Sequence, residues 1–413
     1  MAMQKDLDAE LEKSLKDLSS VQPAPEEKVE FKDRRSQSML VHEVTKGGNL
    51  LVVNKLNVWF SVRRGFIESL TSKEQKWVKA VDGVSFNIKE KEIFCLVGES
   101  GCGKTTTGKA ILRLVEPTGG SVKYMGAGLT SAIIKEAAEE AVSRKLLKKE
   151  EAAADVKAGA VDVRHISKRK MKMLRQKMQM IFQDPYESLN PKQSIYDIVA
   201  EPLVVNNLGA NEAEREKRVA KAIDDAGLRP PKDFMWRYPH EVSGGQRQRI
   251  GIAGALVLDP AFLVADEPVS MLDVSIRSEI LKLMLDLREN KGLTYLFITH
   301  DLSVAYVFSD RIGIMYLGAI VELGPTEEVI KGPRHPYTKA LISVVPKPDP
   351  RMKTEKIILK GERPDPSNIP PGCRFHPRCP FAMEICKKKA PEATFVSKEH
   401  WVSCWLESVE GKT

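Results

Sequence analysis

The sequence predicts an α/β fold with a largely parallel sheet. Short apolar runs such as KEIFCLVG and AFLVADEP, typical of buried strands, alternate with helix-like segments along the chain. One of these strands runs into a glycine-rich turn that is followed directly by a helix-like segment. With 413 residues, 42% of them hydrophobic, the chain is long enough for two or three domains with a substantial core.

The first part of the chain predicts an arm and then the start of the sheet. Residues 1–47 are polar and charge-rich and are interpreted as an N-terminal arm. From about Leu50, LLVVNKLNVWFSV and AVDGVSFNI predict two strands. KEIFCLVG follows as a buried strand, and KTTTGKAILRLV as a helix.

The middle of the chain predicts a helical insertion and a helical subdomain within one domain at 48–345. Residues 129–170 are rich in Ala, Glu, Lys and Leu, with Glu–Lys neighbours at helical spacing, and predict one or two exposed helices. A solvated insertion is the simpler interpretation, and a dedicated binding arm is the alternative. KMQMIFQDP predicts a strand, and the region at 185–250 is expected to be helical.

The remaining elements complete the predicted sheet. AFLVADEP, TYLFITH and RIGIMYLGAIVELG predict buried strands, and SIRSEILKLMLDLREN predicts an amphipathic helix between the first two. From Pro346 the chain becomes rich in proline and cysteine, which predicts a small Cys-rich C-terminal extension at 346–413.

Charge and hydropathy restrict the class of protein. Lys and Arg total 64 and Asp and Glu total 56, so the net charge is +8, which suits either a nucleic acid or an anionic membrane surface as partner. No stretch approaches about 20 apolar residues, so we expect no transmembrane span. The start, MAMQKDLDAELEK, has no apolar core of a secretory signal.

The glycine-rich turn has the spacing G-x-x-x-x-G-K-S/T of a phosphate-binding loop. Its glycines allow backbone N–H groups to surround phosphate oxygens, Lys104 should reach the β- and γ-phosphates, and Thr105 should bind Mg²⁺. A chance glycine turn is the alternative, but a strand precedes the motif and a helix follows it. The predicted ATP contacts here are Gly98, Glu99, Ser100, Gly101, Cys102, Gly103, Lys104, Thr105 and Thr106.

Two acidic residues end another predicted strand. Asp266 and Glu267 follow the apolar run FLVA. A carboxylate at a buried strand end is the expected second Mg²⁺ ligand of a nucleotide site, and its neighbour can orient or polarise an attacking water. Surface acids at an ordinary strand end are the alternative interpretation.

Further motifs extend this pattern in a fixed order. Gln183 follows KMQMIF, the segment Val242-Ser243-Gly244-Gly245-Gln246 lies between the two nucleotide motifs, SMLD follows at 270–273, and His300 ends TYLFITH. Over roughly residues 48–340, the chain thus resembles the ATPase subunits of ATP-binding cassette (ABC) transporters. FQDPYESLNP, GPRHPYTKALISVVPKPDP and IPPGCRFHPRCPFAMEIC resemble the oligopeptide/dipeptide importer subgroup, some members of which also serve oligosaccharide uptake.

The resemblance implies an ABC-type fold and roles for these residues. Glu267, His300 and Gln183 are implied as catalytic residues, and Thr105, Gln183 and Asp266 as ligands of Mg²⁺. Two ATP molecules would be held between two head-to-tail subunits, each covered by the partner's Ser243, Gly244, Gly245 and Gln246. An aromatic ring should stack on adenine; Phe66 is the choice, Phe60 and Trp77 are the other candidates, and an ordinary core or surface aromatic is equally compatible.

The resemblance also implies partners and a location. We expect two membrane permeases, a second and non-identical ATPase subunit and an extracytoplasmic substrate-binding protein, with the chain peripheral on the cytoplasmic face of the cell membrane and no nucleic-acid partner. A soluble ABC ATPase acting on nucleic acid or ribosomes is the alternative. A scaffold that holds ATP only as a structural ligand is disfavoured by Glu267. Val242, Gly254 and Met271 depart from the residues common in the family.

Four late cysteines suggest a metal site. Cys373, Cys379, Cys386 and Cys404 are separated by five, six and seventeen residues. Clustered thiols in a chain without a disulfide pattern favour metal ligation, and the spacing resembles the 4Fe–4S site of some oligopeptide-importer ATPases. Zinc, with His376 and His400 nearby, and free or disulfide-bonded cysteines are the alternatives.

Overall fold

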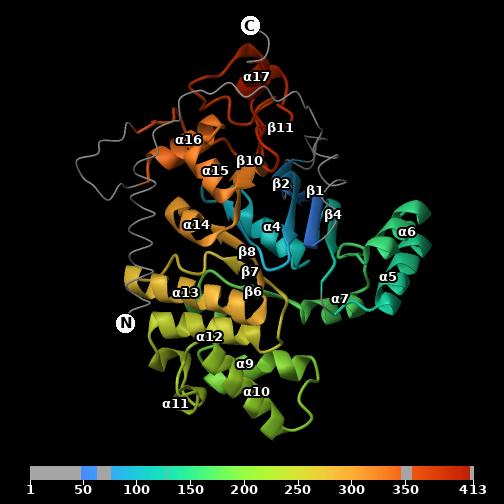
Figure 1. Cartoon of the computed structure of the whole chain (residues 1–413), viewed down its shortest axis with the longest axis vertical. Helices are drawn as coiled ribbons and strands as arrows, with labels where there is room; N and C mark the ends of the chain where they lie inside the picture. Colours follow the sequence, from blue (N-terminus) through green and yellow to red (C-terminus); the bar gives the residue numbers. More distant parts are fainter. Residues whose placement is uncertain (1–47, 63–75, 127, 346–355, 410–413) are drawn as a thin grey trace, which may run out of the picture.

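The computed structural model describes residues 48–62, 76–126, 128–345 and 356–409, and its centre is an eight-stranded mixed sheet (Figure 1). Five neighbouring strands are parallel, as each βα unit of the sequence predicts. They are, in spatial order, β9 (Arg311–Tyr316), β3 (Ile93–Val97), β8 (Thr294–Thr299), β7 (Phe262–Asp266) and β6 (Met178–Ile181).

Antiparallel strands extend this sheet beyond β9. β10 (Ala319–Pro325) forms a hairpin with β9, and two strands of the C-terminal extension follow it, β12 (Trp401–Val402) and β11 (Thr394–Phe395). The expectation of a largely parallel sheet therefore holds for the central strands alone. The hairpin is antiparallel because only Leu317 and Gly318 separate its strands, too few residues for the crossover that parallel pairing needs.

A second, four-stranded antiparallel sheet packs near the first. Its spatial order is β2 (Trp77–Lys89), β1 (Asn49–Ser61), β4 (Gly119–Tyr124) and β5 (Val161–Asp162). Helix α4 (Lys104–Ile111) contacts strands of both sheets, and the apolar residues of β1, β2, α4 and one face of the large sheet form one core. The helix that follows the phosphate loop is thereby held between two layers.

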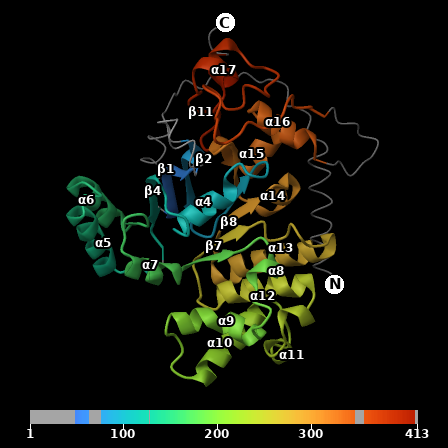
Figure 2. The ribbon, with the colours of Figure 1, turned by 180° about the vertical axis from the view of Figure 1, so that it is seen from behind.

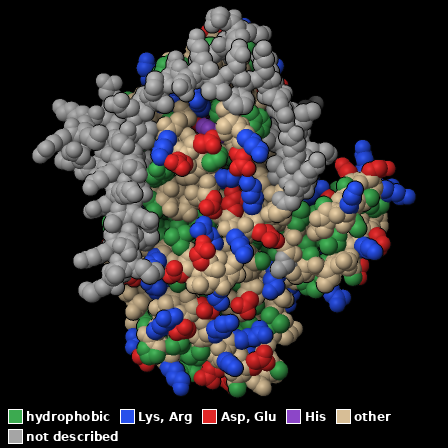
Figure 3. Space-filling view, viewed as in Figure 1, with side chains coloured by type: hydrophobic (Ala, Val, Ile, Leu, Met, Phe, Trp, Pro, Cys, Tyr) green, Lys and Arg blue, Asp and Glu red, His purple; other side chains and the backbone are tan. Residues whose placement is uncertain are grey.

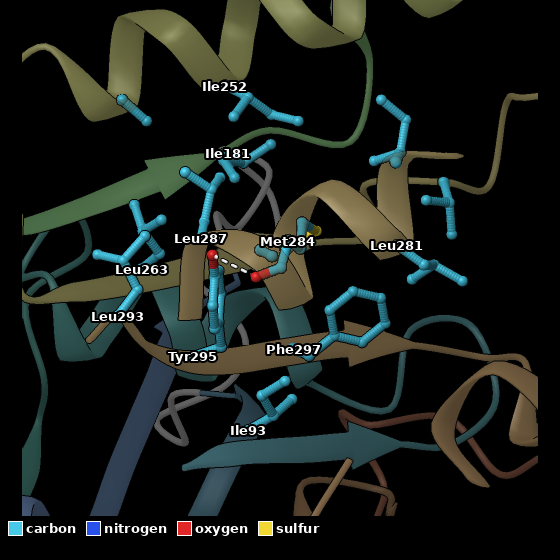
Figure 4. Close-up of a cluster of buried hydrophobic side chains, with 14 of the residues drawn as sticks. Ile93, Ile181, Ile252, Leu263, Leu281, Met284, Leu287, Leu293, Tyr295 and Phe297 are labelled. Carbon is cyan, nitrogen blue, oxygen red and sulfur yellow. Dashed lines mark hydrogen bonds between the residues drawn. The ribbon is translucent and has the colours of Figure 1, made fainter. Parts of the chain in front are cut away.

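The other face of the large sheet is covered by helices. α12 (Gly244–Leu256) and α13 (Val274–Lys291) lie beneath the sheet, and α9 (Ile195–Val205) and α10 (Glu212–Asp225) form a further layer below them (Figures 1 and 2). In Figure 4, Tyr295 of β8 points toward α13 and donates its hydroxyl proton to the Met284 carbonyl at 3.2 Å. The buried Tyr295 hydroxyl thus has a hydrogen-bond partner among the apolar side chains that surround it.

The predicted helical insertion is a pair of helices that pack side by side and project from one side of the molecule (Figure 1). α5 (Ser131–Ser143) and α6 (Lys149–Ala158) contact one another and β5, and α7 (Lys168–Arg175) returns the chain to β6. Only a few residues of the pair are buried, among them Ile134, Ala137, Ala141 and Ala152. This thin core agrees with the polar, Ala-rich composition.

Short helices complete the described chain. They are α8 (Pro185–Ser188), α11 (Lys232–Met235), α14 (Leu302–Phe308), α15 (Thr326–Lys331), α16 (Pro336–Ser343), α17 (Glu384–Lys388) and α18 (Trp405–Val409), with a single 3₁₀ turn at Pro239–Glu241. The extension lies against the upper end of the molecule in Figure 1. Its Phe375, Trp401 and Val402 are buried, so it is docked on the main domain through apolar side chains.

None of the helices in the described part of the chain is long and apolar enough to cross a membrane. On the face shown in Figure 3, acidic and basic side chains are intermixed over the described residues. The net charge of +8 is therefore not gathered into one basic surface on that face.

Candidate functional site

The parallel strands bring the predicted nucleotide residues to one edge of the sheet. β6, β7, β8 and β3 are neighbours and parallel, so their carboxyl ends lie side by side. Gln183 follows β6, Asp266 ends β7 with Glu267 directly after it, and His300 follows β8. The phosphate loop connects β3 to α4, which completes the set.

Two loop glycines are required by close packing. A Cβ on Gly98 would lie 2.2 Å from the Met315 carbonyl oxygen, and one on Gly103 would lie 2.1 Å from the Ala80 carbonyl oxygen. Gly103 also has a φ of 108°, in the region that L-residues rarely adopt. Backbone from β9 and β2 therefore lies so close to the loop that a side chain at either position would not fit.

Lys104 and Thr105 begin α4 and face the site. The Lys104 ammonium donates to the carbonyl oxygens of Gly98 at 2.8 Å and Glu99 at 3.1 Å, and its side chain is buried. The first N–H groups of a helix have no partners within the helix, and together with the ammonium they favour a bound phosphate. These residues have the donors that a polyphosphate requires.

Thr105 and Asp266 meet across 161 residues of sequence. The Thr105 hydroxyl donates to Asp266 Oδ1 at 2.9 Å. Burial raises the pKa of the Asp266 carboxyl above its ordinary value, and the Thr105 hydrogen bond and nearby Lys109 and Lys104 oppose the rise. A hydroxyl and a carboxylate side by side fit the oxygen ligands of Mg²⁺.

Glu267 lies between Gln183 and His300. Its Oε2 accepts from Gln183 Nε2 at 3.1 Å and lies 3.1 Å from His300 Nδ1, so one carboxylate joins the ends of three strands. Glu267 has a φ of 46° although it is not glycine, and its N–H donates to the Ile298 carbonyl at 2.9 Å. A strained backbone at a polar, convergent position is typical of functional residues.

The segment Ser243–Gln246 lies elsewhere. Ser243 caps α12 in a reciprocal capping box with Gln246, with Gln246 N–H to Ser243 Oγ at 3.3 Å and Ser243 N–H to Gln246 Oε1 at 3.0 Å. Among the described residues, no hydrogen bond or ion pair connects this segment to the phosphate loop. A Cβ on Gly245 would lie 2.6 Å from Ile276 Cγ2, which explains the glycine there by packing.

Comparison with known proteins identifies the family. The family model described as "ABC transporter" matches residues 81–270, and "Oligopeptide/dipeptide transporter, C-terminal region" matches residues 321–386. The putative oligopeptide transport ATP-binding protein YkfD of Bacillus subtilis is 46% identical over 335 residues, which cover 81% of this chain and 91% of that protein. This chain belongs to the ABC transporter family. Its relatives there include the dipeptide transport ATP-binding protein DppF of Haemophilus influenzae, 40% identical over 89% of this chain and 99% of that one.

The ATPase also shares its fold with solved members. The dimeric structure of MJ0796, a bacterial ABC transporter cassette, matches with a TM-score of 0.51 at 26% identity, over 67% of this chain and 98% of that one. The family and the oligopeptide/dipeptide subgroup predicted from the motifs are thus confirmed, as is an ATP-hydrolysing enzyme with a mixed α/β P-loop fold.

The adenine-stacking residue is not placed, because Phe66 lies outside the described residues. The other two candidates, Phe60 near the end of β1 and Trp77 at the start of β2, are both exposed on neighbouring strands, where Phe60 pairs with Val78 and Ser61 with Trp77. The choice of Phe66 therefore stays a prediction.

The predicted four-cysteine metal centre of this ATPase is not supported. Cys373, Cys379, Cys386 and Cys404 are free, and the described residues contain no group of three or more His, Cys, Asp or Glu side chains that could hold a metal ion. The thiols do lie within electrostatic reach of one another: burial raises the pKa of Cys404 to about 12, and the other three cysteines add to the rise. His400 instead contacts Glu322, with Nε2 to Oε1 at 2.9 Å.

Sequence reasoning missed the residues that hold the outer side of the phosphate loop. The Glu99 N–H donates to the Tyr337 hydroxyl at 3.0 Å, and the Glu99 carboxylate forms an ion pair with Arg378 at 3.0 Å. Both partners lie more than 230 residues away in the sequence, and their motifs, GPRHPYTKAL and RFHPRCP, are informative only as family patterns. No local spacing could have indicated these contacts.

Proposed function

We propose that this ATPase powers the import of oligopeptides or dipeptides through two membrane permeases, from a peripheral position on the cytoplasmic face of the membrane. Support comes from the match of residues 321–386 to the C-terminal region of oligopeptide/dipeptide transporters and from the names of the relatives. A substrate-binding protein outside the membrane would select the cargo, which can extend to oligosaccharides.

One observation carries the mechanism: Lys104, Thr105, Asp266, Gln183, Glu267 and His300 converge at the carboxyl edge of four neighbouring strands. The loop glycines and Lys104 bind the phosphates of ATP. Glu267 holds the attacking water as a general base, and His300 and Gln183, which both contact its carboxylate, orient it. Chemistry of this kind depends on positioning and charge rather than on covalent intermediates.

A magnesium ion fits the same edge. Thr105 and Asp266 would hold it, with Gln183 as a third ligand, and when bound it would neutralise charge on the β- and γ-phosphates. In the described structure Thr105 and Asp266 are already paired at 2.9 Å, so the two oxygen ligands start side by side. Binding would replace their mutual hydrogen bond and relieve the raised pKa of Asp266, which burial causes.

We propose that the working unit is a head-to-tail pair of ATPase subunits. Ser243, Gly244, Gly245 and Gln246 make no bond to their own phosphate loop among the described residues, which suits action on the nucleotide of the partner. A related cassette has a solved dimeric structure, described as a post-hydrolysis state bound to ADP and Pi. The second subunit is proposed to be a non-identical paralogue.

The alternative of a nucleic-acid or ribosome ATPase is not favoured. Acidic and basic side chains alternate on the face in Figure 3, and the relatives named above are transport proteins. A nucleic-acid protein would be expected to gather its positive charge along one groove or face.

The test is the Glu267→Gln variant of the full chain. We expect ATP binding to persist, steady-state turnover to fall by about 10²–10³-fold because the general base is lost, and an ATP-dependent dimer to accumulate in size-exclusion chromatography. Lys104→Ala serves as the control that loses ATP binding itself. Turnover unchanged in Glu267→Gln would contradict the role given to this carboxylate.

We also propose that Cys373, Cys379, Cys386 and Cys404 hold an Fe–S cluster; the support is their spacing in the sequence, since the described residues form no group of three side chains that could hold a metal ion. Purified chain handled without oxygen should then be brown, absorb near about 400 nm and contain iron and sulfide, and Cys404→Ser should lose both. Colourless protein with one zinc ion per chain would contradict the proposal, as would thiols that remain fully titratable.

A further inference from the structure

The C-terminal extension touches the phosphate loop directly. Glu99, the second residue of the loop, forms an ion pair with Arg378 and a backbone hydrogen bond with Tyr337. Arg378 Nη1 donates to both carboxylate oxygens of Glu99, at 3.2 and 3.0 Å. The Arg378 and Glu99 side chains are 11% and 28% exposed, so the pair is partly shielded from water.

Tyr337 of α16 binds the backbone of Glu99. Its hydroxyl accepts the Glu99 N–H at 3.0 Å, and its ring packs against Tyr316 and Phe375, with centroids 4.7 and 5.5 Å away. Phe375 belongs to the extension and is 1% exposed. The outward-facing side of the loop is therefore bonded to a rigid aromatic layer into which the extension itself inserts.

Other residues of the extension also contact the phosphate loop or the segments beside it. The Arg363 guanidinium lies where it would be 3.0 Å from a Cβ on Gly101, and Pro366 accepts the Lys79 N–H at 3.3 Å. Arg374 forms an ion pair with Asp82 at 2.6 Å and donates to the Leu317 carbonyl. The turn after Leu317 is bonded to the loop as well, because the Gly318 N–H donates to the Cys102 carbonyl at 2.8 Å.

Three of these side chains come from one short segment, the loop at 373–379. Arg374, Phe375 and Arg378 lie between Cys373 and Cys379, and the Cys373 N–H donates to the Cys386 carbonyl at 2.7 Å. Arg378 contacts the phosphate loop, Arg374 contacts the turn bonded to it, and Phe375 packs against Tyr316 and Tyr337. The segment therefore acts on the nucleotide loop as a unit.

We propose that Arg378 is a positioning residue for ATP: through Glu99 it holds the phosphate loop in its binding shape, and the loop at 373–379 thereby sets the affinity of the ATPase for nucleotide. The inference rests on the proposed function, since it assumes that ATP binds at Gly98–Thr105. Arg378 itself touches no phosphate in this arrangement.

The Arg378 contact pre-organises the phosphate loop for ATP. A loop that curls its N–H groups inward must hold glycines at positive φ, as Gly101 and Gly103 do at 72° and 108°, and these conformations cost entropy unless neighbours restrain them. Arg378 Nη1 reaches both carboxylate oxygens of Glu99, and these two charge-assisted contacts restrain the position of that side chain. Without them the free loop samples more conformations, and ATP binding must supply the ordering.

The experiment compares nucleotide binding in full-length variants. Arg378→Gln should raise the dissociation constant for a fluorescent ATP analogue with magnesium, and the KM for ATP, by about tenfold, while kcat at saturating ATP changes by less than about twofold. Arg378→Lys keeps the charge but loses the planar guanidinium, so its affinity for nucleotide should fall between those of the unaltered chain and Arg378→Gln. The double variant with Glu99→Gln and Arg378→Gln should bind nucleotide as tightly as either single variant, because both substitutions remove the same ion pair.

Arg311→Gln is the matched control. Arg311 pairs with Glu92 at 3.2 Å, and their side chains are 11% and 5% exposed, so this ion pair is more shielded from water than that of Arg378 and Glu99. It lies at the amino end of β3 and β9, away from the phosphate loop. Arg311→Gln should lower the melting temperature and leave the KM for ATP unchanged.

Two results would overturn parts of this picture. In the first, Arg378→Gln has a lowered melting temperature, like Arg311→Gln, but binds nucleotide as tightly as the unaltered chain. The Arg378 contact would then contribute to stability and not to nucleotide binding. If the unaltered chain binds ATP no better than Lys104→Ala, the proposed function and this inference are both wrong. If the unaltered chain binds ATP tightly, the comparison with Arg378→Gln tests the role of Arg378 alone.

Discussion

Asp266 illustrates how a single residue trades stability against chemistry. Its side chain is 3% exposed and lies next to Glu267, so in the described structure a carboxylate is held in a buried position and beside another acid. Its pKa is raised chiefly by burial. The Thr105 hydroxyl supplies a single hydrogen bond at 2.9 Å, which compensates only in part. The arrangement makes sense for a site that is completed by a cation.

Asp266→Asn should therefore be more stable and inactive. The amide oxygen can still accept from Thr105 but carries no charge, so we expect the free energy of unfolding at pH 7 to rise by on the order of 1 kcal/mol, while magnesium-dependent ATP hydrolysis is lost. Thermal melts and an ATPase assay measure both.

The pH dependence of that gain has a definite sign. Because the folded pKa of Asp266 is raised, the unaltered chain carries the full cost above that raised pKa and loses it progressively as the pH falls from there to the ordinary value of about 3.8. The advantage of Asp266→Asn should shrink as the pH falls through this window. An advantage that grows toward acid pH, or a less stable variant at pH 7, would show that Asp266 is stabilised in the folded chain.

At the scale of elements, α12 joins a structural and a catalytic role in one residue. Ser243 caps the helix through Gln246, and the same hydroxyl is proposed to reach the partner's ATP. Ser243→Ala should cost about 1 kcal/mol of stability from the lost cap and should also reduce ATPase activity at least tenfold. Asn211→Ala is the control: Asn211 caps α10 by accepting the Glu214 N–H at 2.9 Å, so it should lose similar stability and keep its activity. Equal activity in both variants would restrict Ser243 to capping.

Elements were predictable where the information is local. β3, β7 and β8 are continuous apolar runs, and the phosphate loop between β3 and α4 follows from glycine spacing alone. β12 is different, since it has only the residues Trp401 and Val402 and pairs with Leu323 and Glu322, some 80 positions earlier. Two residues are too few to show the alternating pattern of a strand, so β12 forms only because it can pair with the edge strand β10.

The same limit applies to the site. The site residues lie at or just after the carboxyl ends of parallel strands, and the order of these strands is enough to bring them together: Lys104, Thr105, Asp266, Gln183 and His300. Glu99 is held by Arg378 across 279 residues, and neither residue carries a pattern that indicates the other. Contacts between a domain and an appended segment depend on docking, which single-sequence reasoning does not reach.

For the whole molecule, the extension is part of the fold rather than an appendage. It completes the sheet beyond β10, buries Phe375 and Trp401 in the two cores, and supplies His400 to the fully buried Glu322. Glu322 Oε1 and Oε2 also accept the N–H groups of Arg334 and His335, at 2.8 and 2.9 Å, so this carboxylate ties α16, β10 and the extension together. Removing the extension would uncover apolar surface and leave a buried acid with fewer partners.

A chain ending at residue 345 should therefore be unstable, not merely shorter. Loss of the Trp401 side chain alone should cost about 3–5 kcal/mol, and the uncompensated Glu322 a further 1–3 kcal/mol, so we expect the melting temperature to fall by roughly 10 °C or more, or the protein to be insoluble. Full-length Trp401→Ala, which keeps Arg378 and the loop at 373–379, should reproduce much of the loss in melting temperature with a smaller effect on the KM for ATP. If the shortened chain melts at the same temperature as the full chain and binds ATP equally well, the extension is an independent tail, and the buried contacts of Phe375 and Trp401 contribute nothing measurable.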